Sequence, residues 1–424
     1  MPARIEIDDL LSPQLSEAQR QAIAAAQANP MVITEEAVLG AAQQATGLSD
    51  FGPDDFHERL RLLIDEWNGD TRAYALKRMF LFGYAVRYAT NRLLIHDYLK
   101  QHPEIHDEVI ERPIIVAGLP RSGTTHLLNL LGADSRLRST PLWETYEPVP
   151  NPLEPPREDG VDPRYARTAE KWEMQQASSP LSAAMHPMEP DHFHEDIELQ
   201  GPDFASYNFE WIARSPRFRD HYLSHDQTPH YEYMKTVFKL LQWRDVQAGK
   251  PRKRWVTKCP QHLEQLPVLR KVFPDATVAI TYRDPVEVIQ SAITMIAYGE
   301  RMSYPDIDAK GLLDYWSDRV ERLLRACVRD RHVWPAEQSV DVPFETFMAD
   351  DMAIVRAVRE KAGLPETETA NREIADFIAS HPRGKHGQLV YNLERDFGIS
   401  PAELRKRFDF YFEAFPFVTR PDSQ

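Results

Sequence analysis

The segment from 114 to 131 constrains the fold more than any other part of the chain. An apolar run at 114–117 leads into the loop Gly-Leu-Pro-Arg-Ser-Gly-Thr-Thr at 118–125, and a helical apolar pattern follows it. This order predicts a strand, a tight loop and a helix. Gly118 and Gly123 have the spacing of a phosphate-binding loop, in which backbone N–H groups and a helix N-terminus converge on one anion.

The same loop departs from the nucleoside-triphosphatase pattern. Thr124 stands where those enzymes carry lysine, and Arg121 is the only long cation in the loop. The loop therefore predicts a site for a phosphate ester rather than for the β/γ end of ATP.

Further strands and helices alternate after this unit. Strands are predicted at about 254–258, 276–282 and 338–342, and helical patterns fill most of the sequence between and after them. Strands that alternate with helices are typical of a parallel sheet with helices on both faces. We therefore predict an α/β fold with a central parallel sheet.

Two other regions look helical. Residues 1–110 predict an all-helical N-terminal cap, with Ser12-Pro13 as its first helix start. The apolar stretch at 79–86 is the most hydrophobic in this cap but is far too short to span a bilayer. Residues 111–424 predict the main domain, which carries a helical insertion rich in proline and aromatic residues at about 140–250.

Composition limits the function classes. The formal net charge of the 424 residues is −15, which argues against a general nucleic-acid binder. The two cysteines, Cys259 and Cys327, form no disulfide framework or zinc spacing, so a reducing compartment is expected. No signal peptide or transmembrane segment is recognisable, and we expect a cytoplasmic protein. The sequence leaves a homo-oligomer open.

A second anion site is predicted after the third strand. Arg283 closes that strand, and Asp284-Pro285 is a good helix start. Ser291 lies on the new helix and leans back toward its N-terminus. The carboxyl ends of parallel strands meet at one sheet edge, so Arg283 and Ser291 are expected to grip one further phosphate there.

Together these segments resemble the sulfotransferases that use 3′-phosphoadenosine 5′-phosphosulfate (PAPS), above all a bacterial branch with an Arg-Ser-Gly-Thr-Thr loop. Residues 120–125 resemble their 5′-phosphosulfate loop, and Arg283 with Ser291 resembles their 3′-phosphate pair. Trp-Val-Thr-Lys-Cys-Pro-Gln-His-Leu at 255–263 resembles the strand that precedes this pair. The resemblance covers roughly 112–150 and 250–350, and more weakly 380–415.

The resemblance implies a P-loop-like fold, PAPS as sulfuryl donor and no metal. The loop at 383–391 is similar to the C-terminal loop that closes over the 3′-phosphate in that family. The implied donor-binding residues are Pro120, Arg121, Ser122, Gly123, Thr124, Thr125, Arg283, Ser291, Arg383 and Lys385.

The catalytic base does not transfer from the family. Animal cytosolic enzymes have lysine where Arg121 stands and place a histidine two residues after a strand lysine; counted from Lys258, that position is Pro260. Arg121 and Lys258 are expected to stabilise developing charge. Glu144 is the first choice for the base, unless it pairs with Arg136 or Arg138 instead. Further candidates are His262 and the cluster at 185–196, which includes His186, His192, His194 and Glu195.

The predicted function is transfer of a sulfuryl group from PAPS to a hydroxyl or amine of a small-molecule, lipid or sugar acceptor. Two alternatives remain at this point: a P-loop kinase or other NTPase, and a non-catalytic nucleotide-binding scaffold of the same fold. The acceptor pocket is expected within 140–250, where Trp143, Trp172 and Trp211 either line the pocket or pack in the core.

Overall fold

A five-stranded parallel sheet forms the centre of the computed structural model, which describes residues 3–382 and 384–421. The strand order is β3-β4-β2-β5-β6, so the predicted α/β class with a central parallel sheet is confirmed. The two-residue β3 had no sequence signal. The strands are Ile114–Gly118 (β2), Leu137–Arg138 (β3), Arg254–Cys259 (β4), Thr277–Tyr282 (β5) and Ser339–Pro343 (β6).

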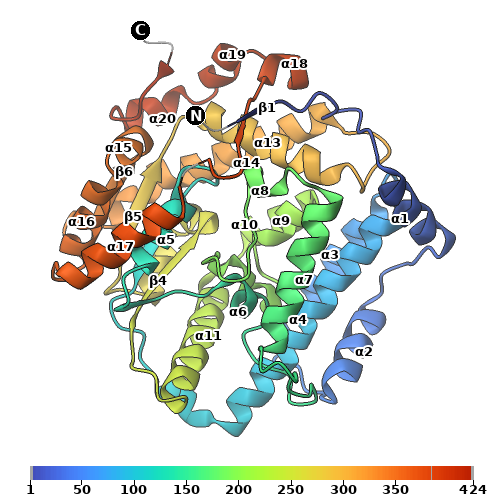
Figure 1. The fold of residues 1–424 in the computed structure, drawn as a ribbon, viewed down its shortest axis with the longest axis horizontal. Coiled ribbons are helices and arrows are strands. Elements are labelled where there is room, and N and C mark those ends of the chain that lie inside the picture. The colour runs from blue at the N-terminus through green and yellow to red at the C-terminus, as the bar shows by residue number, and fades with distance from the viewer. Residues whose placement is uncertain (1–2, 383, 422–424) are drawn as a thin grey trace.

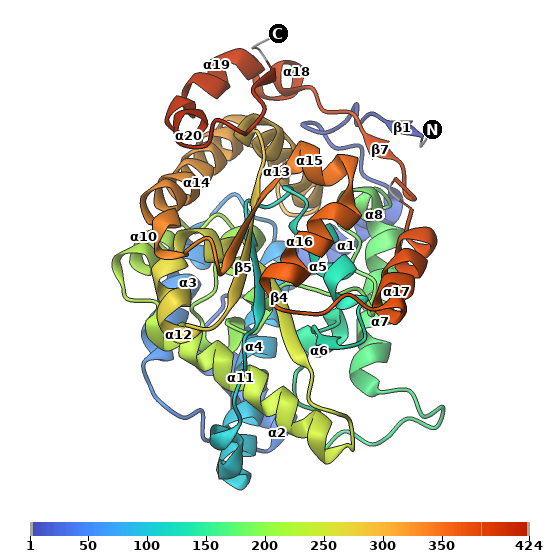
Figure 2. The ribbon, with the colours of Figure 1, turned by 90° about the vertical axis from the view of Figure 1, so that its left-hand side faces the viewer.

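Both faces of the sheet are covered by helices because the central strand β2 is apolar on both faces. Ile114 and Val116 pack toward one helical layer, whereas Ile115 and Ala117 pack toward the other. Figure 2 shows α5, α16 and α17 on one side of the strands, and α11, α12 and α14 on the other. The first layer is Thr124–Gly132 (α5), Phe344–Ala349 (α15), Asp351–Lys361 (α16) and Glu368–Ser380 (α17). The second is Thr228–Gln247 (α11), Leu266–Val272 (α12), Pro285–Glu300 (α13) and Ala309–Asp330 (α14).

The N-terminal region is helical as predicted and lies across the molecule from α15–α17 (Figure 1). One correction concerns its start: α1 begins at Glu17, with Ser16 and Gln19 forming a capping box, rather than at Ser12-Pro13. The domain boundary at 110 stays a prediction. The helices are Glu17–Ala28 (α1), Glu35–Thr46 (α2), Phe56–Gly69 (α3) and Ala75–Gln101 (α4), followed by the 3-10 turn Pro103–Asp107 (η1).

The chain ends meet in a small second sheet. Arg4–Ile5 (β1) pairs in parallel with Gln388–Leu389 (β7), so the N-terminal segment is not entirely helical. Three short helices follow β7 and pack against α13 and α14 of the second layer. They are Leu393–Phe397 (α18), Pro401–Lys406 (α19) and Asp409–Ala414 (α20).

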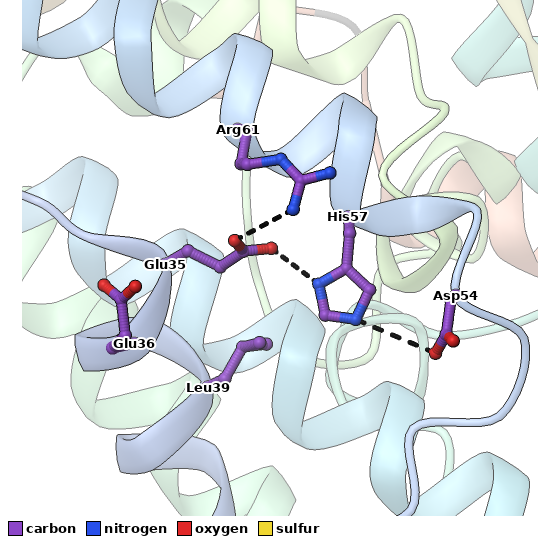
Figure 3. Close-up of a pocket in the computed structure, with 6 residues that line it drawn as sticks. All are labelled: Glu35, Glu36, Leu39, Asp54, His57 and Arg61. Carbon is purple, nitrogen blue, oxygen red and sulfur yellow. Dashed lines mark hydrogen bonds and ion pairs between the residues drawn. The ribbon is translucent and has the colours of Figure 1, made fainter.

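A surface pocket between α2 and α3 is explained by packing of the cap. Figure 3 shows Glu35 of α2 between two partners on α3. Its carboxylate lies 2.6 Å from His57 Nδ1 and 3.2 Å from Arg61 Nη1. These ion pairs join the two helices, and we assign the pocket no further role.

The predicted insertion packs with the N-terminal helices in one apolar cluster, which joins α2–α4 to residues 204–223. None of the helices in the described part of the chain is long and apolar enough to cross a bilayer. The insertion comprises Leu142–Tyr146 (α6), Pro163–Ser178 (α7), Ser182–Met185 (α8), Asp196–Glu198 (η2), Gly201–Asp203 (η3), Asn208–Ile212 (α9) and Pro216–Ser224 (α10).

A buried ion triad ties this insertion to the sheet layer. Arg319 of α14 donates from Nε to Glu210 Oε1 at 3.0 Å and from Nη2 to Glu264 Oε1 at 2.6 Å. Glu264 ends the turn Pro260–Glu264 (η4), which follows β4 directly. Burial raises the pKa of Glu210, although Arg319 opposes the shift. Two hydrogen-bonded carboxylates therefore satisfy one buried guanidinium and fix α9 beside the end of β4.

We predict that Gly118→Ala destabilises the protein by about 1–3 kcal/mol, the usual cost of overpacking. A Cβ at position 118 would lie 1.9 Å from Thr281 Oγ1 on the neighbouring strand. Urea unfolding would measure the change in the free energy of unfolding.

Gly40→Ala is the matched control for this substitution. A Cβ at this helical position meets nothing within 4 Å, and alanine should stabilise the helix by about 0.5–1 kcal/mol. Equal effects of the two substitutions would contradict the close approach of β2 and β5.

Candidate active site

A cavity of about 1440 Å³ lies at the carboxyl edge of the sheet. Residues that follow β2, β4 and β5 line it, among them Arg121, Pro260 and Arg283. The central strand β2 is flanked by β4 and β5, so the strand order reverses next to it. Open α/β sheets bind ligands in the crevice at the carboxyl end of the strands, at such a reversal point. Helices α4, α7, α8 and α13 contribute much of the remaining lining.

The loop after β2 has the geometry that its glycines predicted. Gly123 has φ of 86° and precedes the first turn of α5, and Arg121 also lies in the left-handed region with φ of 64°. The first turn of a helix leaves N–H groups without intrahelical partners, and these face an anion well. Pro120, Thr124 and Thr125 line the cavity together with Arg121 and Gly123.

Ser122 is the exception in this loop. Its hydroxyl donates to Leu119 O at 2.5 Å and lies 2.6 Å from Thr281 Oγ1, and its N–H bonds to Leu119 O at 3.3 Å. The residue is fully buried and does not line the cavity. The polar groups of Ser122 hold the loop against β5, and its expected contact with the sulfuryl donor stays a prediction.

The two predicted anion anchors lie directly beside each other. Arg121 Nε donates to Ser291 Oγ at 3.0 Å, and Arg283 Nη1 donates to the carbonyl oxygen of Arg121 at 2.5 Å. Ser291 Oγ also lies 2.9 Å from Tyr391 Oη. Burial lowers the pKa of Arg283, and the charge of Arg121 adds to the shift. Two positive charges therefore lie close together, oriented by Ser291 and a backbone carbonyl, and Glu287 lies 3.8 Å from the Arg283 guanidinium.

Arg283 is oriented by the start of α13 and by an aromatic ring. Asp284 caps this helix by accepting from Val286 N at 3.0 Å, as the sequence predicted. The guanidinium of Arg283 lies 4.1 Å from the centroid of the Phe344 ring, which also lines the cavity. The stacking leaves the edge of the guanidinium available for an anion.

Lys258 brings β4 into the same site. Its Nζ donates to Thr125 Oγ1 at 3.0 Å and to Glu195 Oε1, although the side chain is only 1% exposed. Glu195 lines the cavity, whereas Lys258 lies behind it. A cation, a hydroxyl and a carboxylate therefore form one connected group beside the phosphate-binding loop.

The segment that carries Glu195 is fixed on both sides. Phe193 forms an antiparallel bridge with Pro141, and His194 N donates to Thr140 O at 3.0 Å. Asp196, the next residue, accepts a hydrogen bond from Thr257 Oγ1 of β4. These contacts hold Glu195 beside Lys258.

Glu144 and His262 lie outside the cavity lining. Glu144 forms an ion pair with Arg138 at 2.7 Å, the alternative that the sequence had left open. His262 is fully buried, with Nε2 3.0 Å from Asp196 Oδ2 and Nδ1 3.0 Å from Tyr231 Oη. Because both side chains are engaged away from the cavity, we replace them as candidate bases.

Among the histidines of the 185–196 cluster, His186 and His194 line the cavity, and His186 remains a candidate. Burial lowers the pKa of His186 to about 3, helped by the charges of Arg121 and Lys258. Burial likewise lowers the pKa of His192 to about 4 and that of His194 well below its ordinary value. All three imidazoles are therefore neutral at pH 7.

The C-terminal loop reaches the cavity through its backbone and small residues. Gly384, Gly387 and Gln388 line it with Tyr391. Lys385 does not: it is 51% exposed and its Nζ lies 3.9 Å from Glu189. Arg383 lies outside the described residues, so its expected role stays a prediction.

Three potential metal ligands lie together behind this site. Ligand atoms of Asp196, Cys259 and His262 are within 4.8 Å of one another. The direct bond between Asp196 and His262 and the hydrogen bond from Thr257 to Asp196 explain the group as a polar network. Cys259 and Cys327 are both free and buried.

Of the three tryptophans singled out in the sequence, Trp172 and Trp211 line the cavity. Trp143 is not part of the lining; the guanidinium of Arg164 lies 4.7 Å from its ring centroid.

Comparison with known proteins agrees with this geometry. A model of the sulfotransferase family matches residues 113–368. The chain belongs to this family. The match runs from the strand before the phosphate-binding loop past the sheet edge at β6. The search of curated proteins gives no match.

Two solved sulfotransferases share the whole architecture. Sulfotransferase STF1 from Mycobacterium tuberculosis H37Rv is 26% identical with a TM-score of 0.74, over 89% of this chain and 99% of that chain. Sulfotransferase STF9 from Mycobacterium avium is 25% identical with a TM-score of 0.79, over 92% of this chain and 98% of that chain. The family and the fold together support sulfuryl transfer in general.

We predict that the protein loses stability as the pH falls from about 6.5 toward 3. An unfolded histidine takes up a proton near pH 6.5, whereas folded His186, with its pKa near 3, resists protonation over this range. Protonation therefore favours the unfolded chain. His186→Asn should flatten the pH dependence of the unfolding free energy by up to about 1.4 kcal/mol per pH unit.

Denaturant unfolding of both proteins at several pH values measures this difference, since the carboxylates contribute to both alike. Parallel curves would contradict a buried neutral imidazole at 186.

Proposed function

We propose that the protein transfers a sulfuryl group from PAPS to an acceptor hydroxyl. The observation that carries the proposal is that two anion anchors, Arg121 and Arg283, line one cavity together with Glu195, whose carboxylate accepts a hydrogen bond from the buried Lys258 behind it. Family membership supports the reaction type.

The residues present fit such a donor. An adenosine with phosphate groups at its 3′ and 5′ positions needs a separate set of hydrogen-bond donors and positive charges for each of these two anionic ends. Arg121, Thr125 and the first turn of α5 suit the 5′ end, and Arg283 with Ser291 suits the 3′ end. Trp172 or Trp211 offers an aromatic face for stacking.

The cations act where charge develops. Sulfuryl transfer is an in-line displacement, analogous to phosphoryl transfer, in which negative charge grows on the leaving oxygen. Arg121 and Lys258 are already positioned by Ser291 and Thr125, so little reorganisation is needed.

Glu195 is the proposed general base. It is the carboxylate that contacts Lys258 and lines the cavity beside the loop. It can accept the proton of an acceptor hydroxyl while Lys258 donates toward the leaving oxygen. His186, neutral and close to Arg121, is placed to orient that hydroxyl.

We predict that adenosine 3′,5′-bisphosphate raises the melting temperature and that ATP with magnesium does not. A ligand at a hundred times its Kd stabilises the folded state by about 2.7 kcal/mol. Arg283→Ala should weaken this affinity roughly 10- to 100-fold through loss of a charge-assisted contact.

Arg61→Ala is the matched control, since Arg61 belongs to the α2–α3 pocket. Titration calorimetry measures each affinity. Equal stabilisation by ATP would favour an NTPase instead.

We predict that Glu195→Gln lowers kcat by about 10²–10⁴, the usual contribution of a general base, while the affinity for the bisphosphate stays close to that of the wild type. Glu144→Gln tests the competing choice: it should retain kcat but lower the melting temperature, because Arg138 loses a partner. The reverse pattern in turnover assays would restore Glu144 as the base.

A further inference from the structure

The cavity is larger than one donor site requires. Its volume of about 1440 Å³ exceeds the roughly 300–1,000 Å³ typical of a site for one small molecule. The donor anchors occupy the end next to the sheet. The other end extends between α4, α7 and α13, and most of its lining is apolar.

The outer rim of this second half is apolar and exposed. Met79 and Phe80 of α4 are 47% and 55% exposed, and Met174 of α7 is 63% exposed. Single exposed apolar residues are common. These three come from two distant parts of the sequence and yet line the same cavity, which is the arrangement of a ligand entrance.

Arg87 and Lys77 of α4 are already hydrogen-bonded within the protein, whereas Lys171 of α7 and Glu300 of α13 also line this half. Arg87 donates to Glu198 Oε2 at 2.8 Å, and Tyr88 Oη donates to the same oxygen at 2.7 Å. Lys77 Nζ donates to Ile212 O at 2.5 Å. Apart from these charged groups, the lining of this half is mainly hydrocarbon and aromatic.

Two glycines widen the passage. Gly83 of α4 and Gly299 of α13 both line the cavity. A Cβ added at either position meets nothing within 4 Å. A side chain would therefore fit in open space at these two positions on the cavity wall.

We propose that the acceptor is an amphiphile: a hydroxyl-bearing head near Glu195 and an apolar chain that lies between α4, α7 and α13. This inference rests on the proposed function and names its acceptor class. The acceptor oxygen bonds to sulfur as its proton passes to Glu195. The bond from sulfur to the phosphate oxygen breaks, and its electron pair leaves with adenosine 3′,5′-bisphosphate.

Binding of n-alkyl β-D-glucosides tests the proposal. Titration calorimetry would compare chains of four to twelve carbons, below their micelle concentrations and with the bisphosphate present. We expect the Kd to fall by up to about fourfold for each added methylene, the transfer free energy of one CH₂. A Kd that does not depend on chain length, or no binding of any chain, would overturn the proposal.

A second experiment tests the proposal by placing large side chains in the apolar passage. Gly83→Phe and Gly299→Phe should remove most of the gain from long chains and leave bisphosphate affinity unchanged. Gly40→Phe is the matched control, because Gly40 is also helical with open space but does not line the cavity. If Gly40→Phe also removed the increase in affinity with chain length, the result would contradict binding of the alkyl chain in this passage.

The outcomes separate this inference from the function on which it rests. If the bisphosphate does not stabilise the wild type, the proposed function fails, whatever the chains do. If the bisphosphate binds but chain length has no effect, the acceptor class alone fails. Light scattering tests whether a second copy of this chain occupies the rim instead. If the wild type is a dimer and Gly83→Phe dissociates it, the rim is a dimer interface and the proposal is overturned.

Discussion

The site depends on two arginines that the fold holds side by side. Arg121 and Arg283 contact one another through a backbone carbonyl, and Ser291 fixes the first of them. Burial and mutual repulsion disfavour this arrangement, as the lowered pKa of Arg283 records. An anion with two charged ends relieves the repulsion, and the N-terminus of α5 adds a further positive potential. A displacement reaction in which negative charge grows on the leaving oxygen is favoured by positive groups that are already in position before the substrate binds.

The rest of the molecule keeps this charge in place and builds the cavity around it. The parallel sheet brings three loops to one edge, and the Arg319 triad fixes the insertion beside β4. The N-terminal helices belong to this arrangement, since α4 lines the cavity and shares an apolar cluster with residues 204–223. The region that the sequence presents as a cap thus forms part of the wall of the site.

Local patterns predicted the fold well, and they also predicted that Arg121, Arg283 and Ser291 lie together at one edge of the sheet. The loop at 118–125, the cap at Asp284 and the position of Ser291 on α13 follow from short-range rules of turns and helix starts. The sequence could not show that Ser122 lies outside the cavity lining, because the direction of its hydroxyl depends on Thr281, on another strand. Glu144 was preferred over Glu195 for a similar reason. Only packing shows that Arg138 engages the first and Lys258 the second.

The sequence by itself determined the chemistry at the sheet edge, because a glycine loop and a strand-end arginine act through backbone geometry within a few residues of themselves. Tertiary structure alone decided which carboxylate faces the cavity and how large that cavity is. It also decided that Met79 and Met174, ninety-five positions apart, share one rim. Such features depend on long-range packing between helices, and no local periodicity encodes that packing.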